Sequence, residues 1–297
     1  MIPKSLKDQK VMVGVLTYPG HAYCRDEWIK NTLEVTKGHD VYLLWNGSGN
    51  PKKIFPKNWT IDTMNRDGLS GIRILEKGHQ KIRRYFLARK YTHLFMLESD
   101  TFPPPGTIDK FLTHDKDALS CLYFIKAEGK MHYKVPLNNL RLDKQFRGKN
   151  IVLVKRDIIP SVWGLVNNPK IDNYLRISGI DPDEAVNAQT ESRLWRITDA
   201  LPQRGLVRVL ASGVGSVLIK REVLEMIDFR VQDGDIQQFT DFMLYWDMYN
   251  AGFKTFVDTD TWANHIHPFD EIQSREKWFD AKTAHGSNVR PESHKFK

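Results

Sequence analysis

The chain has 297 residues, of which 41% are apolar and 27% are charged, and it carries a net charge of +8. These values are typical of a soluble globular protein with one large α/β domain or two small ones. No apolar run reaches the length of a membrane span, the N-terminus has no apolar signal region, and the two cysteines are too few for a disulfide scaffold or a zinc site. We therefore expect a cytoplasmic protein.

The first 50 residues predict a strand, a helix and a second strand. Residues 11–17 form a near-continuous apolar run, which is typical of a buried strand, and Tyr18-Pro19-Gly20 interrupts it. Asp26 is the expected N-cap of a helix that ends at Gly38, and residues 41–45 form the second apolar run. A strand, a helix and a strand within about 35 residues predict a βαβ unit with parallel strands.

A basic helix is expected next. The apolar segment 71–75 precedes a helix predicted near 77–90, which leads to the apolar run 93–97. The helix carries six basic residues, Lys77, Lys81, Arg83, Arg84, Arg89 and Lys90. With the net charge, they favour a polyanionic partner such as nucleic acid, an anionic membrane face or a phosphorylated substrate. A merely solvated basic face explains them equally well.

Two carboxylates follow the buried run 93–97, in Glu98-Ser99-Asp100. Residues 101–106 contain three prolines and a glycine and are expected to continue neither a helix nor a sheet. Carboxylates at the exit of a buried strand are costly without a nearby cation, and ligands bind at the carboxyl ends of α/β strands. A divalent cation that bridges a diphosphate would supply the charge. The other interpretation of this tripeptide is an ordinary acidic turn.

The second half of the sequence contains segments with clear strand or helix patterns and one long segment with only weak patterns. Residues 126–206 show only weak strand patterns, and we interpret them as an insertion suited to acceptor recognition. The remaining strands are expected at 117–124, 206–211, 217–219 and 253–257, and helices at 221–227 and 240–250. We therefore predict a single domain over 1–275 and a polar tail over 276–297.

Several stretches in this order resemble the GT-A-fold glycosyltransferases, in particular the large family-2-like group, over roughly 1–125 and 206–267. They are 11–18, Asn46-Gly47-Ser48, Glu98-Ser99-Asp100, 213–224, Thr240-Asp241-Phe242 and the stretch from Ala251-Gly252-Phe253 to His265. The resemblance implies a GT-A (Rossmann-like) α/β fold, with a mostly parallel central sheet flanked by helices and an inserted segment. The sequence departs from the family pattern in two places, because Asn46 and Glu98 stand where the family usually has an acidic residue and Asp, respectively.

The resemblance also implies roles for individual residues. A nucleotide-diphosphate sugar, with UDP as the favoured nucleotide, would be bound by Thr17, Tyr18, Arg25, Asn46, Ser48 and Ser99. Mn²⁺ or Mg²⁺ would be held by Glu98, Asp100 and His265. His267 is an alternative ligand, because alternation along an extended chain points both histidines to the same side. Asp241 would be the catalytic base, although an acid in the first turn of a helix is also a common stabilising feature.

The predicted function is transfer of a sugar to an acceptor hydroxyl, with inversion, by a metal-dependent glycosyltransferase. The acceptor could be a polyanion such as DNA, or a cell-surface glycan. A nucleotidyltransferase is one alternative, but it would need a glycine-rich basic loop after the first strand, and Thr17-Tyr18-Pro19-Gly20 is not one. A nucleic-acid-binding module is another, suggested by the charge and by Trp45, Trp59 and Trp163 near basic residues. It leaves the acidic residues at 98–100 unexplained.

Overall fold

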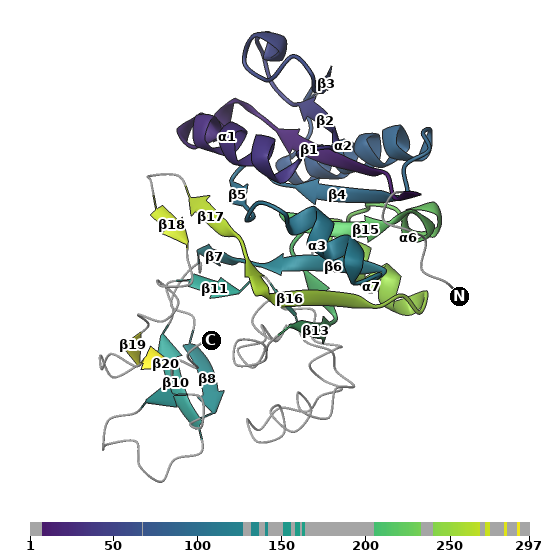
Figure 1. Ribbon diagram of the computed structural model, residues 1–297. Helices are drawn as coiled ribbons and strands as arrows, with labels where there is room; N and C mark the ends of the chain where they lie inside the picture. Colours follow the sequence, from purple (N-terminus) through teal and green to yellow (C-terminus); the bar gives the residue numbers. More distant parts are fainter. Residues whose placement is uncertain are drawn as a thin grey trace.

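The computed structural model describes residues 8–66, 68–126, 205–232 and 240–267, and the backbone of several short strands elsewhere (Figure 1). Those short strands are β8 (His132–Pro136), β9 (Leu140–Arg141), β10 (Ile151–Lys155), β11 (Ile158–Pro160), β12 (Val162–Trp163), β18 (Glu271–Gln273), β19 (Lys282–Thr283) and β20 (Arg290–Pro291). Most of the predicted insertion at 126–206 and of the predicted tail at 276–297 lies outside the described residues.

An eight-stranded sheet, in the order β3-β2-β1-β4-β15-β6-β16-β13, forms the centre of the molecule (Figure 1). Its strands are β1 (Val11–Thr17), β2 (Asp40–Trp45), β3 (Thr60–Thr63), β4 (His93–Leu97), β6 (Ala118–Leu122), β13 (Leu206–Val209), β15 (Ser216–Lys220) and β16 (Thr255–Trp262). Strands β1 to β4, β6 and β16 run in one direction, whereas β15 and β13 run antiparallel to their neighbours. The sheet is therefore mostly parallel, as predicted.

Helices cover both faces of the sheet. Helices α1 (Arg25–Val35) and α3 (Thr107–Thr113) pack on one face, and α2 (Gly71–Leu87), α6 (Arg221–Met226) and α7 (Thr240–Asn250) pack on the other (Figure 1). Burial on both faces explains why β1, β4 and β6 are continuous apolar runs. Among the described helices, none has both the length and the apolar character to span a membrane. This architecture confirms the predicted α/β class, with a mostly parallel central sheet flanked by helices.

Two helix boundaries differ from the predictions. Helix α1 begins at Arg25 with Cys24 as its N-cap, so that Asp26 lies in the first turn instead of capping it. Helix α2 begins at Gly71, because the apolar segment 71–75 forms its first turns, where Ile74 is buried against the sheet. The third strand is β3, which was not predicted because its sequence, TIDT, is short, polar and partly exposed at the sheet edge.

The segment after Asp100 also differs from the prediction. Thr101–Phe102 forms a short strand, β5, which pairs antiparallel with β17 (Asn264–His267). In this pairing His265 stands opposite Thr101. The expected loop is therefore a small sheet that brings the C-terminal histidine segment next to the exit of β4.

Candidate active site

A cavity of about 240 Å³ lies where the carboxyl ends of β1, β2 and β4 meet. Five of the residues predicted for the site line it, namely Thr17, Tyr18, Asn46, Glu98 and Asp100. Its other lining residues are Leu16, His21, Ile74, Leu75, His79, Met96 and Leu97. The cavity is therefore lined by both polar and apolar side chains, as expected for a ligand site at the carboxyl edge of an α/β sheet.

Glu98 is held tightly at the exit of β4. Its backbone N–H donates to the carbonyl of Gly215 at 3.0 Å, and its carbonyl accepts from Trp28 Nε1 at 2.9 Å. A Cβ atom at Gly215 would lie 2.8 Å from Glu98 Oε2, so any other residue there would displace the carboxyl group. Burial raises the pKa of Glu98 to about 8, and the charges of Asp100 and Asp241 act in the same direction. Burial at this position therefore favours the protonated form of Glu98.

Asp100 lies between two histidines. Its Oδ2 atom is 3.3 Å from His265 Nε2 and 3.8 Å from His21 Nε2, and its side chain is only 15% exposed. Burial favours the neutral acid, but the hydrogen bond and charge of His265, together with His21, bring the pKa of Asp100 below its usual value. Burial likewise opposes the charged form of His265, but Asp100 raises the pKa of His265 overall. The structure thus brings Asp100 and His265 together, and Glu98 lies within electrostatic reach of both.

His21 belongs to this cluster, and the sequence analysis missed it. It lies in the 3-10 helix η2 (Pro19–Tyr23), directly after β1, where its Nδ1 atom contacts Ser99 Oγ. Its ring packs on Tyr18 with the ring centroids 4.5 Å apart, and burial lowers the pKa of His21 although Asp100 opposes this effect. A histidine in the exit loop of the first strand is the signal that could have identified it.

The predicted nucleotide residues fall into three groups. Thr17, Tyr18 and Asn46 line the main cavity, and Arg25 and Ser99 line a smaller hollow that shares Thr17, Tyr18 and His21 with it. Asn46 is 4% exposed, and its Oδ1 atom is buried without a hydrogen-bond partner. Ser48 is not among the described residues that line either space, and its carbonyl accepts from Trp45 Nε1 at 3.1 Å.

The donor atoms around Asp100 fit a divalent cation in part. Asp100 Oδ1 and His265 Nδ1 are buried and lack hydrogen-bond partners, and a carboxylate with an imidazole suits Mn²⁺. Within the described ranges, however, no three His, Cys, Asp or Glu side chains are placed to hold a metal ion by themselves. Asp100 and His265 would therefore hold the ion together with oxygens of a bound phosphate or water. His267 ends β17, but its side chain lies outside the described residues.

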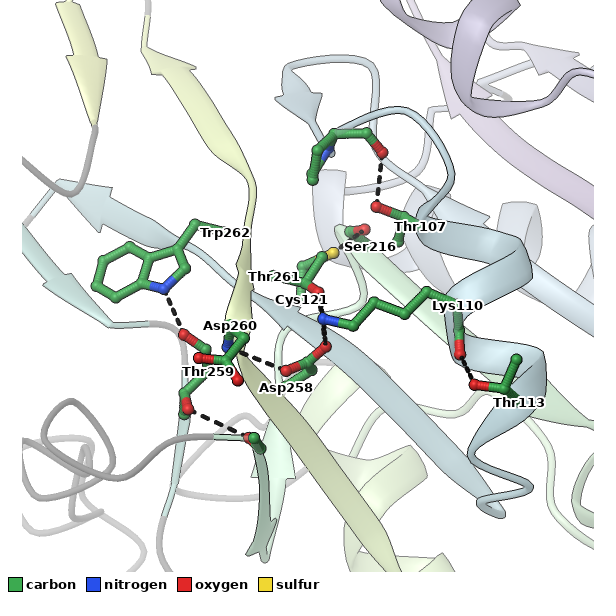
Figure 2. A network of polar contacts seen from close by, with 12 residues as sticks. Thr107, Lys110, Thr113, Cys121, Ser216, Asp258, Thr259, Asp260, Thr261 and Trp262 are labelled. Atoms are coloured by element: carbon green, nitrogen blue, oxygen red, sulfur yellow. Dashed lines mark hydrogen bonds and ion pairs between the residues drawn. The ribbon is translucent and has the colours of Figure 1, made fainter. Parts of the chain in front are cut away.

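A buried ion pair supports the strand that leads to His265. Asp258 on β16 has a side chain that is 1% exposed, and one of its oxygens lies 2.5 Å from Lys110 Nζ of α3. The same oxygen accepts from Thr261 Oγ1 at 2.6 Å, and Asp258 Oδ1 accepts from the N–H of Asp260 at 3.0 Å (Figure 2). The pairing of β16 with β6 is irregular between Asp258 and Trp262, and these contacts hold the chain there. The network thus stabilises the chain shortly before β17.

Asp241, the predicted base, lies in the first turn of α7. Its Oδ1 atom accepts from the N–H of Phe242 at 2.8 Å. Its charge contributes to the raised pKa of Glu98, so Asp241 lies within electrostatic reach of the acidic end of the cavity. The other acid on this helix, Asp247, forms a two-bond ion pair with Arg230 at 2.7 Å, as expected for a structural residue.

Some of the features that suggested a nucleic-acid-binding module are structural. Trp45 and Trp59 are buried, with 2% and 6% of their surfaces exposed, so they are not available to stack on bases, and the Trp163 side chain lies outside the described residues. On α2, Arg83 Nε donates to the carbonyl of Leu224 at 2.7 Å. Just after α2, the guanidinium of Arg89 lies 3.3 Å from the ring centroid of Tyr85. Four of the six basic residues, Lys77, Arg84, Arg89 and Lys90, are exposed.

No family model and no curated protein sequence matches this chain. The chain is similar only to solved structures. The protein A197 from STIV is 12% identical with a TM-score of 0.42, and the match covers 90% of this chain and 94% of that one. GalNAc-T7, solved with UDP, GalNAc and Mn²⁺, is 12% identical with a TM-score of 0.48 over 87% of this chain and 44% of that one. S. aureus TarS 1–349 in complex with UDP-GlcNAc is 12% identical with a TM-score of 0.45 over 86% of this chain and 57% of that one. The chain thus matches only part of these last two proteins.

Proposed function

We propose that the chain is a metal-dependent glycosyltransferase that moves a sugar from a nucleotide-diphosphate sugar to an acceptor hydroxyl. The observation that carries this proposal is the position of Asp100. It lies at the exit of β4, 3.3 Å from His265, and it faces the same cavity as Thr17, Tyr18 and Asn46. A cation site that adjoins a polar pocket at the strand ends suits a ligand with a nucleoside and a diphosphate.

In this proposal the nucleoside occupies the ends of β1 and β2. The unpartnered Asn46 Oδ1 accepts a hydrogen bond from the base or ribose, and Tyr18 provides an aromatic surface that is 39% exposed. Arg66 lies with its guanidinium 5.7 Å from the ring centroid of Tyr18, so a positive charge stands at the rim. The resemblance to family-2-like enzymes favours UDP as the nucleotide.

Asp100 and His265 would hold Mn²⁺ or Mg²⁺ beside the diphosphate. When bound, the ion stabilises negative charge on the departing diphosphate as a Lewis acid. Glu98 adjoins them, and a nearby divalent cation would favour loss of its proton. Asp100 is already ionised at neutral pH because the two histidines lower its pKa.

Asp241 is the proposed base for an inverting transfer. Its carboxylate takes the proton of the acceptor hydroxyl as the acceptor oxygen forms a bond to the anomeric carbon. The bond from that carbon to the phosphate oxygen breaks, and its electron pair leaves with the nucleoside diphosphate. The half-buried position of Asp241 near the acidic end of the cavity supports this role.

The acceptor is proposed to be a glycan or a polyanion such as DNA, and the net charge of +8 supports the polyanion. We also propose that residues 1–275 form one catalytic domain and that 126–206 contribute to acceptor recognition.

A panel of nucleotide sugars with Mn²⁺, assayed for release of nucleoside diphosphate, tests the activity. Calorimetry with UDP in the presence and absence of Mn²⁺ tests the site separately. Absence of both turnover and UDP binding would overturn the proposal.

A further inference from the structure

We propose that His79 is a positioning residue that connects a ligand in the cavity to the first turn of α7, where Asp241 lies. The inference rests on the proposed function, because it takes the cavity as the donor site. Three observations lead to it. His79 lines the cavity, its Nδ1 atom lies 3.1 Å from Thr240 Oγ1, and Asp241 follows Thr240 directly.

The backbone that carries His79 has no room to shift toward the sheet. A Cβ atom at Gly78 would lie 2.5 Å from Leu16 Cδ2, and a Cβ atom at Gly14 would lie 2.5 Å from Ile82 Cγ2. These two glycines allow α2 and β1 to pack in direct contact. The Cα atom of His79 is therefore held at a constant place relative to the end of β1, which forms the other side of the cavity.

The ring of His79 is 3% exposed and packs against Phe229, with the ring centroids 5.1 Å apart. The same segment is bound to α2 by two hydrogen bonds, one from Gln80 Nε2 to the carbonyl of Phe229 at 2.5 Å and one from the N–H of Val231 to Glu76 Oε1 at 3.0 Å. These contacts fix the segment against which the imidazole packs. Thr240 occupies Nδ1, so Nε2 is the ring nitrogen left for a ligand in the cavity.

The protonation state of the His79 ring determines which of its nitrogens donates a hydrogen bond and which accepts one. Burial lowers the pKa of His79 to about 4, so the imidazole is neutral and has one N–H group and one acceptor nitrogen. When a ligand oxygen accepts from Nε2–H, Nδ1 must accept from the hydroxyl of Thr240. A bound diphosphate or sugar oxygen therefore selects the tautomer that binds Thr240 as a hydrogen-bond donor.

This selection affects the start of α7. Thr240 is the first residue of the helix and is 2% exposed, and Asp241 in the same turn reaches the acidic end of the cavity electrostatically. A hydrogen bond that strengthens on ligand binding would hold that turn, and with it the carboxylate of Asp241, in one place. Donor binding would thus prepare the proposed base before the acceptor arrives.

Hydrogen–deuterium exchange of the full chain tests the connection, with UDP and Mn²⁺ as the probe. We expect UDP to slow exchange of peptides that cover 240–250 by about threefold or more in the wild type. Thr240→Val keeps the branched shape but removes the hydroxyl, so it should retain UDP affinity within about threefold and lose the slowing. Thr240→Ser, the matched control, should restore the slowing. Thr240→Ala replaces Thr240→Val if the latter does not fold.

Variants of His79 separate the two ring nitrogens. The amide of Gln reaches the place of Nε2 but not that of Nδ1, so His79→Gln should bind UDP and lose the slowing, whereas His79→Ala should weaken UDP binding as well. If UDP binds without slowing exchange at α7, or slows it equally in Thr240→Val, the inference is wrong and the donor site stands. If UDP does not bind to the wild type, the inference is wrong, and the proposed function is overturned as well when the panel of nucleotide sugars shows no turnover.

Discussion

His265 Nε2 lies 3.3 Å from Asp100 Oδ2, because the pairing of β17 with β5 sets His265 opposite Thr101. The chain therefore brings a residue near its C-terminal end to the exit of a central strand. Both side chains also have a buried polar atom without a hydrogen-bond partner, Asp100 Oδ1 and His265 Nδ1. Unpaired buried atoms of this kind are costly, and a bound cation would satisfy the carboxylate.

The first prediction concerns this pair. Asp100→Asn should abolish the Mn²⁺-dependent part of UDP binding, because an amide oxygen cannot supply the negative charge, and His265→Ala should weaken it to a lesser degree. Calorimetric titration of UDP with and without Mn²⁺ measures the effect. Asp26→Asn is the matched control, since the Asp26 side chain is 79% exposed on α1. Unchanged Mn²⁺-dependent binding in Asp100→Asn would remove Asp100 from the ligand set.

The second prediction concerns the ion pair between Lys110 and Asp258. Asp258→Leu should destabilise the protein by about 2 kcal/mol, which is less than the loss of a fully buried pair because the Lys110 side chain is 42% exposed. Guanidinium denaturation monitored by circular dichroism measures the change. In a double-mutant cycle, Lys110→Met combined with Asp258→Leu should cost less than the sum of the single changes. Strictly additive effects would mean that the two side chains do not interact.

The same network should influence the metal site. Asp258 accepts from Thr261 Oγ1 and from the N–H of Asp260, which shapes the chain immediately before β17. Its loss should therefore weaken Mn²⁺-dependent UDP binding by displacing His265, although Asp258 itself does not line the cavity. A destabilised variant with wild-type UDP affinity would show that β17 is held in place by its pairing with β5 alone.

The sheet centre could be predicted from the sequence, whereas the sheet edge could not. Strands β1 and β4 are buried on both faces, so their apolar residues are continuous and recognisable. Strand β3 is an edge strand with the polar sequence TIDT, and no local pattern distinguishes it from a loop. The apolar residues at 71–75 were ambiguous for the opposite reason, because short apolar runs suit either a strand or a buried helix turn.

The site residues that could be predicted are those that directly follow a recognisable strand in the sequence. Glu98 and Asp100 follow a recognisable strand, so their place at the cavity followed from the sequence. The role of His21 depends on its contacts with Ser99 and Asp100, which only the fold brings near it. His79 was missed because a histidine on an amphipathic helix gives no signal that its ring lines a cavity.

The third prediction concerns Asp241. Asp241→Asn retains the oxygen that accepts from the N–H of Phe242, so the first turn of α7 should stay intact. It removes the basicity, and transfer should fall by about two to four orders of magnitude, the usual contribution of a positioned base. UDP and Mn²⁺ binding should stay within about twofold of the wild type, since Asp241 is not a proposed ligand. Asp247→Asn, on the same helix, is the control for general effects on α7.

A transfer rate close to that of the wild type in Asp241→Asn would contradict the proposal that Asp241 is the catalytic base. It would leave Asp241 as an acid in the first turn of a helix, where it interacts favourably with the helix dipole. The proposal of inversion would then lose its main support. Analysis of the anomeric configuration of the product by NMR tests inversion independently of this variant.

The fourth prediction concerns pH-dependent stability and follows from His79. Burial lowers the pKa of His79 from 6.5 to about 4 in the folded protein, so the unfolded chain binds a proton in this range before the folded protein does. Stability contributed by the neutral imidazole is therefore present above pH 6.5 and is lost as the pH falls from 6.5 toward 4. Between pH 7 and pH 5 the loss should be about 2 kcal/mol.

The comparison of wild type with His79→Gln isolates this effect, because glutamine does not titrate and His21, whose pKa is also lowered, is present in both proteins. Urea denaturation at several values of pH gives the free energy of unfolding of each. The difference between the two proteins should change by about 2 kcal/mol from pH 7 to pH 5, with the variant losing less stability as the pH falls. Parallel curves would mean that the imidazole of His79 is protonated as readily in the folded protein as in the unfolded chain, and the tautomer-based connection to Thr240 would lose its basis.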